Sequence, residues 1–258
     1  MLNTLFVAWN ELPSHAWFPI GRLTSDGNSY QFAYTAGAIV AQRQGGFKPL
    51  WSFPDWDKVY FSPELFSVFS NRLLRPSRPD YPDFLHWLNL SQSENDSMLL
   101  LARSGGQRVT DRLEVFSPEE VDEDGLYHFH FFARELQHLP SDGLNRIDRL
   151  QPGDLLQPVE IEHIENGYIR RILSLSTVDG CRVGNCPKYL LESDFLRLYQ
   201  EPERVQIVVE QVNLSPAPQA FRLLCHLAVQ GGGGFQPFSS LLYQPIFSEL
   251  AATGATIL

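Results

Sequence analysis

Side chains able to bind a metal ion are scattered along this sequence. No two cysteines have the C-x-x-C spacing of zinc sites, and no two histidines have the H-E-x-x-H spacing. His128 and His130 are spaced so that a strand would place both on one face. We interpret the cysteines as ordinary core residues and expect no metal. The full set of metal-ligand candidates is His128, His130, His138, His163, His226, Cys181, Cys186 and Cys225.

Nucleophilic or acid–base catalysis has equally little support. The sequence contains no G-x-S-x-G motif and no isolated pair of acids within an apolar run. The glycine run 231–234 is not followed by the Lys-Ser or Lys-Thr pair of a phosphate-binding loop, so we interpret it as a joint in the chain. We therefore expect no enzymatic activity and no cofactor.

The net charge of −10 is unevenly distributed. Residues 118–126 contain five acids and no base, whereas residues 1–117 contain eleven acids and ten bases. Neither half of the chain is basic, although a protein that binds nucleic acid regardless of sequence usually carries a positive field. Any contact with nucleic acid must therefore be local. We interpret residues 118–126 as a solvated linker, with an interaction segment as the alternative.

Composition places the chain among folded proteins of one or two domains. Its 258 residues are 43% apolar and 19% charged. No stretch approaches the ~18 consecutive apolar residues of a membrane span, and the N-terminus lacks the pattern of a secretory signal. Three cysteines without close pairing fit a reducing compartment. We expect a cytoplasmic protein without membrane contact.

The first half predicts strands followed by short helices. The clearest hairpin spans 20–34, where I-G-R-L and Y-Q-F-A-Y flank a turn at 25–28. Ser62 and Pro63 are the residue types that start a helix, which we expect over 63–74. The other expected elements are a strand at 2–9, a helix at 83–90, a helix or strand at 97–105 that ends at two glycines, and a strand at 112–116.

The second half predicts a β-rich unit with one helix. A strand opens it at 127, and two more strands, 155–161 and 168–176, flank an Asn166-Gly167 turn. An Asp179-Gly180 hairpin leads to a short strand at 181–187. A helix at 188–200, strands at 205–212 and 221–229, and a flexible Gly-rich tail with aromatic anchors at 230–258 complete the chain.

The order strand, loop, strand, D-G turn, strand, P-K-Y-L and helix resembles the HIRAN family over residues 128–228. The resemblance implies a small β-barrel of OB type that holds the end of a DNA single strand, with stacked aromatic rings over the terminal bases. Asn166 and Tyr168 match the Asn and Tyr of the family's N-P-Y-D loop, whereas Ile169 replaces the Asp that contacts the terminal sugar. His138 lies where the family has a second aromatic residue.

Basic residues near Tyr168 complete the expected nucleic-acid site. The candidate phosphate contacts are Arg170, Arg171, Arg182 and Lys188. Because Arg170 and Arg171 must point to opposite faces of one strand, at most one of them joins the site, and we assign Arg171. The nucleic-acid-binding set is therefore Tyr168, His138, Asn166, Arg171, Arg182 and Lys188.

A second resemblance covers residues 5–117. Four motifs carry it, in this order: I-G-R-L, Y-Q-F-A-Y, L-F-S-V-F-S-N-R-L-L and M-L-L-L-A-R-S-G-G. They are similar to the N-terminal subdomain of HipA-type kinases, and the kinase core is missing. Arg72, Arg75 and Arg78 fall at helical spacing, either as a salt-bridged helix end or as an anion patch. With Phe69 they form the partner-binding set that this resemblance implies.

Aromatic residues crowd the segment from 51 to 69. Prolines at 49, 54 and 63 keep this segment irregular, so we expect some of its rings to be exposed. Exposed aromatic clusters mark surfaces for partners. The rings are Trp51, Phe53, Trp56, Tyr60, Phe61, Phe66 and Phe69.

These observations predict an α+β protein in four segments: a HipA-N-like α+β domain at 1–117, an acidic linker at 118–126, a HIRAN-like barrel with one helix at 127–229, and a tail at 230–258. The leading hypothesis is a non-enzymatic accessory protein that contacts single-stranded or distorted DNA. The alternative is a protein-interaction module, the partner or antitoxin of a HipA-like kinase toxin. Gene neighbourhood would distinguish the two.

Overall fold

The structure is a computed structural model of the chain. It describes residues 4–11, 16–108, 110–118, 120–165, 168–191, 195, 199, 201–232 and 235–246, with the backbone alone at 163, 165, 168 and 202. No helix among these residues is long and apolar enough to cross a membrane.

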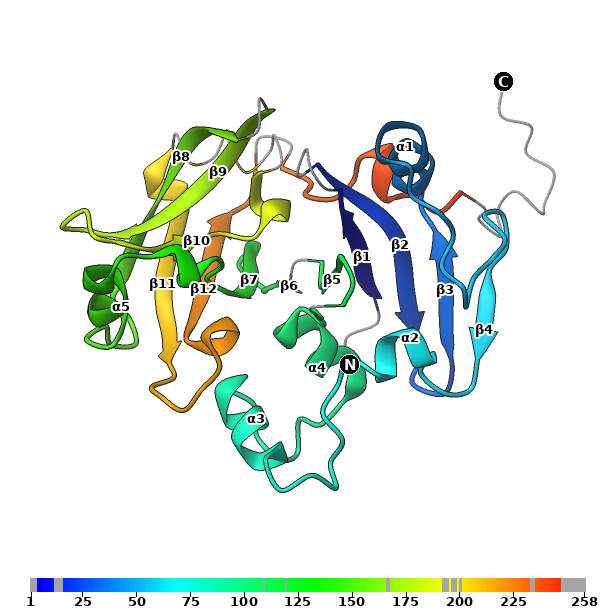
Figure 1. Cartoon of the computed structure of the whole chain (residues 1–258), viewed down its shortest axis with the longest axis horizontal. Helices are drawn as coiled ribbons and strands as arrows, with labels where there is room; N and C mark the ends of the chain where they lie inside the picture. Colours follow the sequence, from blue (N-terminus) through cyan, green and yellow to red (C-terminus); the bar gives the residue numbers. More distant parts are fainter. Residues whose placement is uncertain are drawn as a thin grey trace. The chain divides into compact units, whose positions relative to one another are not determined.

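The chain forms two compact units (Figure 1). Unit 1 comprises residues 1–75, 96–118 and 238–258, and unit 2 comprises residues 76–95 and 119–237. Both combine helices with a sheet, and the ladders of the described strands are antiparallel. The expected α+β class is confirmed.

Unit 1 is built on a five-stranded sheet in the order β4-β3-β2-β1-β5. Its apolar face packs against α1 and α4, and the core includes Leu5, Ile20, Phe32 and Phe53, all fully buried. The strands are β1 (Thr4–Asn10), β2 (Trp17–Ser25), β3 (Tyr30–Tyr34), β4 (Tyr60–Ser62) and β5 (Leu113–Phe116). The helices are α1 (Ala36–Gly45), α2 (Ser67–Ser70), α4 (Ser97–Ser104) and the 3₁₀ turn η5 (Leu241–Tyr243).

The hairpin of β2 and β3 forms as the sequence predicts. Asp26 Oδ1 accepts hydrogen bonds from the backbone N–H groups of Asn28 and Ser29 at 2.9 and 2.7 Å, an Asx turn that reverses the chain. These bonds favour the ionised carboxylate and lower the pKa of Asp26. The hydrogen bonds of this turn therefore set the register of the ladder between β2 and β3.

The C-terminal segment completes unit 1. Phe238 and Tyr243 are buried, and both rings pack against Phe6 at centroid distances of 5.7 and 4.9 Å. Backbone bonds join Ala36 N–H to Gln244 O and Ile246 N–H to Tyr34 O. The aromatic anchors expected in the tail thus hold residues 238–246 on unit 1, and residues 247–258 lie outside the described part of the chain.

Unit 2 is built on a seven-stranded sheet in the order β10-β9-β8-β11-β12-β7-β6. The strands are β6 (Glu120–Val121), β7 (Leu126–Phe132), β8 (Leu155–Glu165), β9 (Tyr168–Thr177), β10 (Arg182–Asn185), β11 (Val205–Val212) and β12 (Leu223–Gln230). The helices are α3 (Tyr81–Trp87) and α5 (Ser141–Ile147). The 3₁₀ turns are η1 (Leu136–His138), η2 (Lys188–Leu191), η3 (Pro202–Arg204) and η4 (Gln219–Phe221).

The ladders among the described residues leave this sheet open, so they do not confirm the HIRAN-like OB-type barrel that we expected. One isolated bridge joins β10, at one end of the strand order, to the segment that follows β7, the next-to-last strand at the other end. Arg134, just beyond β7, exchanges two backbone hydrogen bonds of 2.8 and 3.0 Å with Asn185 at the end of β10. The sheet is therefore curved enough for the segment after β7 to meet β10 at one residue pair.

Three segments differ from the sequence expectation. The helix expected over 63–74 is only α2, because residues 60–62 before it pair with β3 and the chain turns after Asn71. Helix α1 was not expected. Of the helix expected over 188–200, the structure describes η2 and two isolated residues, 195 and 199, and the rest lies outside the described residues.

The unit boundaries also differ from the expected domains. Residues 76–95 belong to unit 2, because Asn213 Nδ2 and Gln211 Nε2 donate to the carbonyls of Trp87 and His86 at 2.8 and 2.7 Å. Part of the expected linker is strand β6, which pairs with β7. The docking of residues 76–95 depends on partners 125 and 126 residues away, whereas β6 pairs with the next strand of the chain.

Candidate functional site

A polar network centred on Glu135 joins three elements of unit 2. Arg170 of β9 donates to Glu135 Oε1, and Asn185 Nδ2 of β10 donates to Glu135 Oε2 at 2.6 Å. Arg182 Nη2 donates to Asn185 Oδ1 at 2.8 Å and extends the chain of contacts. Glu135 and Arg170 are 28% and 16% exposed at the side chain, so the network borders solvent.

Backbone geometry fixes where the carboxylate lies. Glu135 has φ of 61°, a left-handed conformation that costs a non-glycine residue about 1 kcal/mol or more. It precedes η1, and the neighbouring residue Arg134 is held by its bridge to Asn185. The surrounding contacts thus hold Glu135 in a conformation that its own chain disfavours.

The three charged residues named in this network are Arg170 and Arg182, which are positive, and Glu135, which is negative. Arg170 faces the Glu135 carboxylate, whereas no carboxylate in the described part of the chain pairs with Arg182. The buried Nε of Arg182 also has no hydrogen-bond partner there. A guanidinium satisfied only by a neutral amide keeps its charge available for an anion.

The structure separates Arg171 from the residues expected beside it. Arg171 Nη1 pairs with Glu160 Oε1 of β8 at 3.0 Å and is 55% exposed, while its neighbour Arg170 turns toward η1. Alternation along β9 therefore directs Arg170, and not Arg171, to the same network as Arg182.

The other expected nucleic-acid residues flank this network or fall outside the description. His138 is exposed at the end of η1, which packs against β10. Lys188 is half-buried at the start of η2, which packs against β9. Asn166 and the side chain of Tyr168 lie outside the described residues.

Glu135 and Asn185 are site residues that sequence reasoning missed. Glu135 is 35 residues from Arg170 and 50 from Asn185, so no local spacing connects them. Arg170 was a candidate phosphate contact, but of the two consecutive arginines Arg171 was the one assigned to the site. The one available signal is the alternation of two consecutive arginines along a strand.

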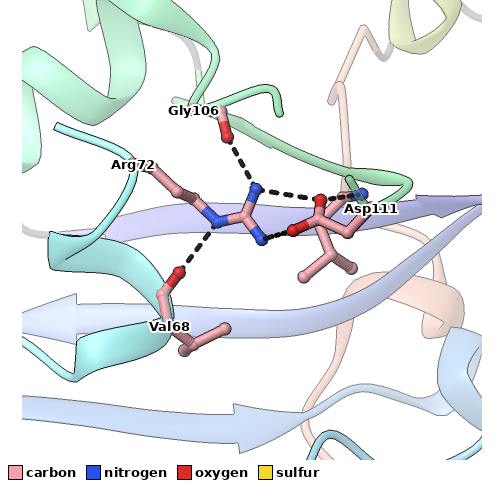
Figure 2. A network of polar contacts seen from close by, with 5 residues as sticks. Val68, Arg72, Gly106 and Asp111 are labelled. Carbon is pink, nitrogen blue, oxygen red and sulfur yellow. Dashed lines mark hydrogen bonds and ion pairs between the residues drawn. The ribbon is translucent and has the colours of Figure 1, made fainter. Parts of the chain in front are cut away.

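Arg72, expected at a partner surface, has a structural role in unit 1 (Figure 2). Its side chain is 2% exposed and donates to the carbonyls of Val68 and Gly106 at 2.8 and 2.7 Å. It also forms a bidentate pair with Asp111, with N–O distances of 3.1 and 2.6 Å. Gly106 has φ of 54°, a conformation available to glycine, and this turn aims its carbonyl at the guanidinium.

The four residues of the expected partner-binding set do not form one surface. Phe69 is fully buried in the core of unit 1, so Phe69 and Arg72 are corrected to structural residues. Arg75 is exposed, and Arg78, exposed in unit 2, pairs with Asp80 at 2.8 Å. The helical spacing that suggested the cluster is absent, because α2 ends at Ser70.

Three histidines stack on one face of the unit 2 sheet. His226 lies between His128 and His130, with ring-centroid distances of 5.1 and 4.8 Å and nearly parallel planes. His128 Nε2 is 2.9 Å from Asp122 Oδ2, and His128 Nδ1 is 2.9 Å from His226 Nε2. Since a carboxylate only accepts, neutral His128 donates from Nε2 and accepts from the N–H of His226.

This histidine cluster shows no metal-ligand geometry. Nowhere in the described residues could a group of three or more His, Cys, Asp or Glu side chains hold a metal ion. His130 is engaged by Glu210 at 2.6 Å, and Asn89 donates to the other Glu210 oxygen at 2.8 Å. Each imidazole is therefore used in a hydrogen-bonded network.

The buried cysteines behave as core residues. Cys186 and Cys225 are buried free thiols, and burial raises the pKa of both. A thiol held in its neutral form is a poor nucleophile and a poor metal ligand. The interpretation of these two cysteines as packing residues is confirmed by their burial.

No family model, curated protein or solved structure matches this chain.

We predict that Arg72→Ala destabilises the protein by about 2–4 kcal/mol, because it leaves Asp111 and two carbonyls without their donor. Arg78→Ala removes an exposed pair that solvent screens, so it should destabilise the protein much less than Arg72→Ala. Urea unfolding of both variants measures the difference. Equal losses would contradict a structural role for Arg72.

We predict a pH-dependent effect of Asp122→Asn. The hydrogen bond from His128, followed by the backbone N–H of Leu126, lowers the pKa of Asp122. A lowered folded-state pKa contributes stability above the unfolded pKa of about 3.9, and this stability is lost as the pH falls through the folded pKa.

Wild type should therefore have a higher free energy of unfolding than Asp122→Asn at neutral pH, and this difference should disappear below about pH 4. Asp124→Asn, which removes the same charge from the same turn, is the control and should show a smaller effect. Urea titrations at a series of pH values measure both. A gap that does not depend on pH would refute the role of the carboxylate charge.

Proposed function

We propose that unit 2 binds single-stranded or distorted DNA at the Glu135 network, as a non-enzymatic accessory protein. The observation that supports this proposal is Arg182, a half-buried guanidinium with no carboxylate partner among the described residues, next to a second arginine. Phosphate oxygens are the ligands that such a fork of N–H groups matches best.

The order of elements in unit 2 supports the same proposal. Strand β8, strand β9, the Asp179-Gly180 turn, strand β10 and the 3₁₀ turn η2 at K-Y-L-L follow each other in the order on which the HIRAN resemblance rests. The Arg134–Asn185 bridge is compatible with an OB-type barrel, a fold that is itself partly open. The fold alone carries no function, so the proposal depends on the residues of the network.

Charge limits the kind of contact. Unit 2 contains eleven bases and twenty-one acids, so its net charge is −10, and unit 1, with nine of each, is neutral. A long cationic groove is incompatible with this balance. A contact with one or two phosphates, as at the end of a DNA strand, is compatible with this net charge.

We predict salt-sensitive binding of a fluorescent single strand of about 12 nucleotides at low ionic strength. Arg182→Ala should weaken binding and reduce the slope of log K against log salt concentration by about 0.7, the loss expected for one phosphate contact on a single strand. Fluorescence anisotropy between about 50 and 200 mM salt measures both.

Arg171→Ala is the matched control, because it removes the same charge from the other face of β9. It should leave affinity and slope nearly unchanged, whereas Tyr168→Ala should weaken binding if the ring stacks on a base. A blunt duplex of the same length should bind less well. Absence of binding at low salt, or equal effects of Arg171→Ala and Arg182→Ala, would overturn the proposal.

A second proposal concerns unit 1, as the partner of a HipA-like kinase. The observation that favours it is that most of the segment resembling the kinase subdomain, residues 5–75 and 96–117, packs into unit 1, where Tyr34, Phe32 and Leu101 are fully buried. A stand-alone copy of a kinase subdomain would need such a packed core. The proposal also needs a partner surface other than Arg72 and Phe69.

We predict that the full chain co-elutes in gel filtration with a purified HipA-type kinase core encoded beside it. The control is the same kinase carrying its own N-terminal subdomain, which should compete. Separate elution at about 10 μM of each protein would count against an affinity useful for regulation.

A further inference from the structure

Trp51 of unit 1 is completely exposed, with a relative accessibility of 102%. Tryptophan is the side chain with most to gain from burial, and an isolated, fully exposed indole in an otherwise packed unit is unusual. Trp51 lies in the loop between α1 and β4, where its neighbours Phe47 and Phe53 are buried.

The loop holds Trp51 in place. Leu50 O accepts from Phe53 N–H at 2.7 Å, so residues 50–53 form a β-turn with Trp51 at its first corner. The buried hydroxyl of Tyr34 ties both ends of this turn, accepting from Leu50 N–H at 2.7 Å and donating to Phe53 O at 2.8 Å. Burial of this hydroxyl raises the pKa of Tyr34, so it remains a donor across the physiological range.

A cavity of about 450 Å³ lies beside the turn. Its apolar lining includes Trp9, Phe47, Leu50, Val68 and Leu113, and Trp51 borders it. The Phe47 ring packs on Trp9 at 5.2 Å, which keeps this wall fixed. An exposed aromatic residue on an ordered turn beside an apolar pocket is the arrangement of an interface hot spot.

Cations border the same cavity. Lys48 and Arg112 are exposed lining residues, and no carboxylate among the described residues pairs with either. The lining acid, Asp111, is already engaged by Arg72. The mouth of the cavity therefore carries two uncompensated positive charges, in a unit whose total charge is zero.

We propose that the Trp51 surface, defined as Trp51, Lys48, Arg112 and the cavity wall of Trp9, Phe47 and Leu113, binds an acidic segment of a partner protein that carries an apolar side chain. The apolar side chain packs against Trp51 and enters the cavity. Carboxylates beside it reach Lys48 and Arg112. Charge complementarity selects this occupant over a neutral or basic one. The proposal is independent of DNA binding by unit 2.

The test uses the full chain and the blocked peptide Asp-Glu-Glu-Phe-Asp-Glu as the probe. The indole N–H resonance of Trp51, assigned by its loss in Trp51→Ala, should shift on titration. Trp51→Ala and Lys48→Glu should each weaken binding at least about tenfold, the loss expected at a hot spot. Lys58→Glu is the matched control, because Lys58 lies over the Tyr60 ring in the same loop and does not line the cavity.

Four outcomes would overturn the proposal. These are no shift up to about 1 mM peptide, equal losses from Lys48→Glu and Lys58→Glu, tighter binding of a Lys/Arg version of the peptide, and a Trp51 shift that depends on protein concentration alone. The last would mean that a second copy occupies the surface. A probe in which Ser replaces Phe should bind more weakly. Binding of single-stranded DNA should be the same in Trp51→Ala and wild type, which separates this surface from the Glu135 network.

Discussion

A guanidinium removed from water must find acceptors for its N–H groups, and this constraint divides the arginines of the chain into two kinds. Arg72 donates to two carbonyls and to both oxygens of a carboxylate, so its positive charge is already paired within unit 1 and is not available to a ligand. Arg182 is half-buried with a neutral amide as its partner. The same residue type is a structural tie in unit 1 and a candidate anion contact in unit 2.

The difference could not be predicted from spacing. Arg72, Arg75 and Arg78 look like a cluster because they recur every three residues, but the helix ends at Ser70 and the guanidinium of Arg72 finds a carboxylate 39 residues away. Arg170 and Arg182 look unrelated, and are joined through Glu135 and Asn185. Side-chain networks between distant elements are invisible to periodicity, which reports local structure alone.

Local signals were accurate where local chemistry decides the structure. The Asp26 turn, the Gly105-Gly106 end of α4 and the Asp179-Gly180 hairpin are each fixed by side chains or glycine conformations within a few residues. Residues 76–95 pack on β11, and residues 235–246 pack on the units to which they belong, through partners that are distant in sequence. The domain boundaries expected from the linear sequence therefore missed this packing. The crowding of aromatic rings at 51–69 did indicate that some would be exposed, as Trp51 and Phe61 are, although not which ones.

The partition of charge separates the two proposed surfaces. The whole net charge of the chain belongs to unit 2, where it opposes any long contact with a polyanion, so specificity at the Glu135 network must come from a small number of oriented donors. Unit 1 is neutral overall, so two uncompensated cations at the Trp51 surface are sufficient to set its preference.

The ordered turn also reduces the entropy lost on association, because the Tyr34 hydroxyl already holds the backbone on both sides of Trp51. The free protein exposes the whole indole to water, and a partner that covers the ring gains the free energy of its burial. A fully exposed indole on a turn whose backbone is already ordered is what distinguishes the Trp51 surface from the other exposed apolar residues of unit 1.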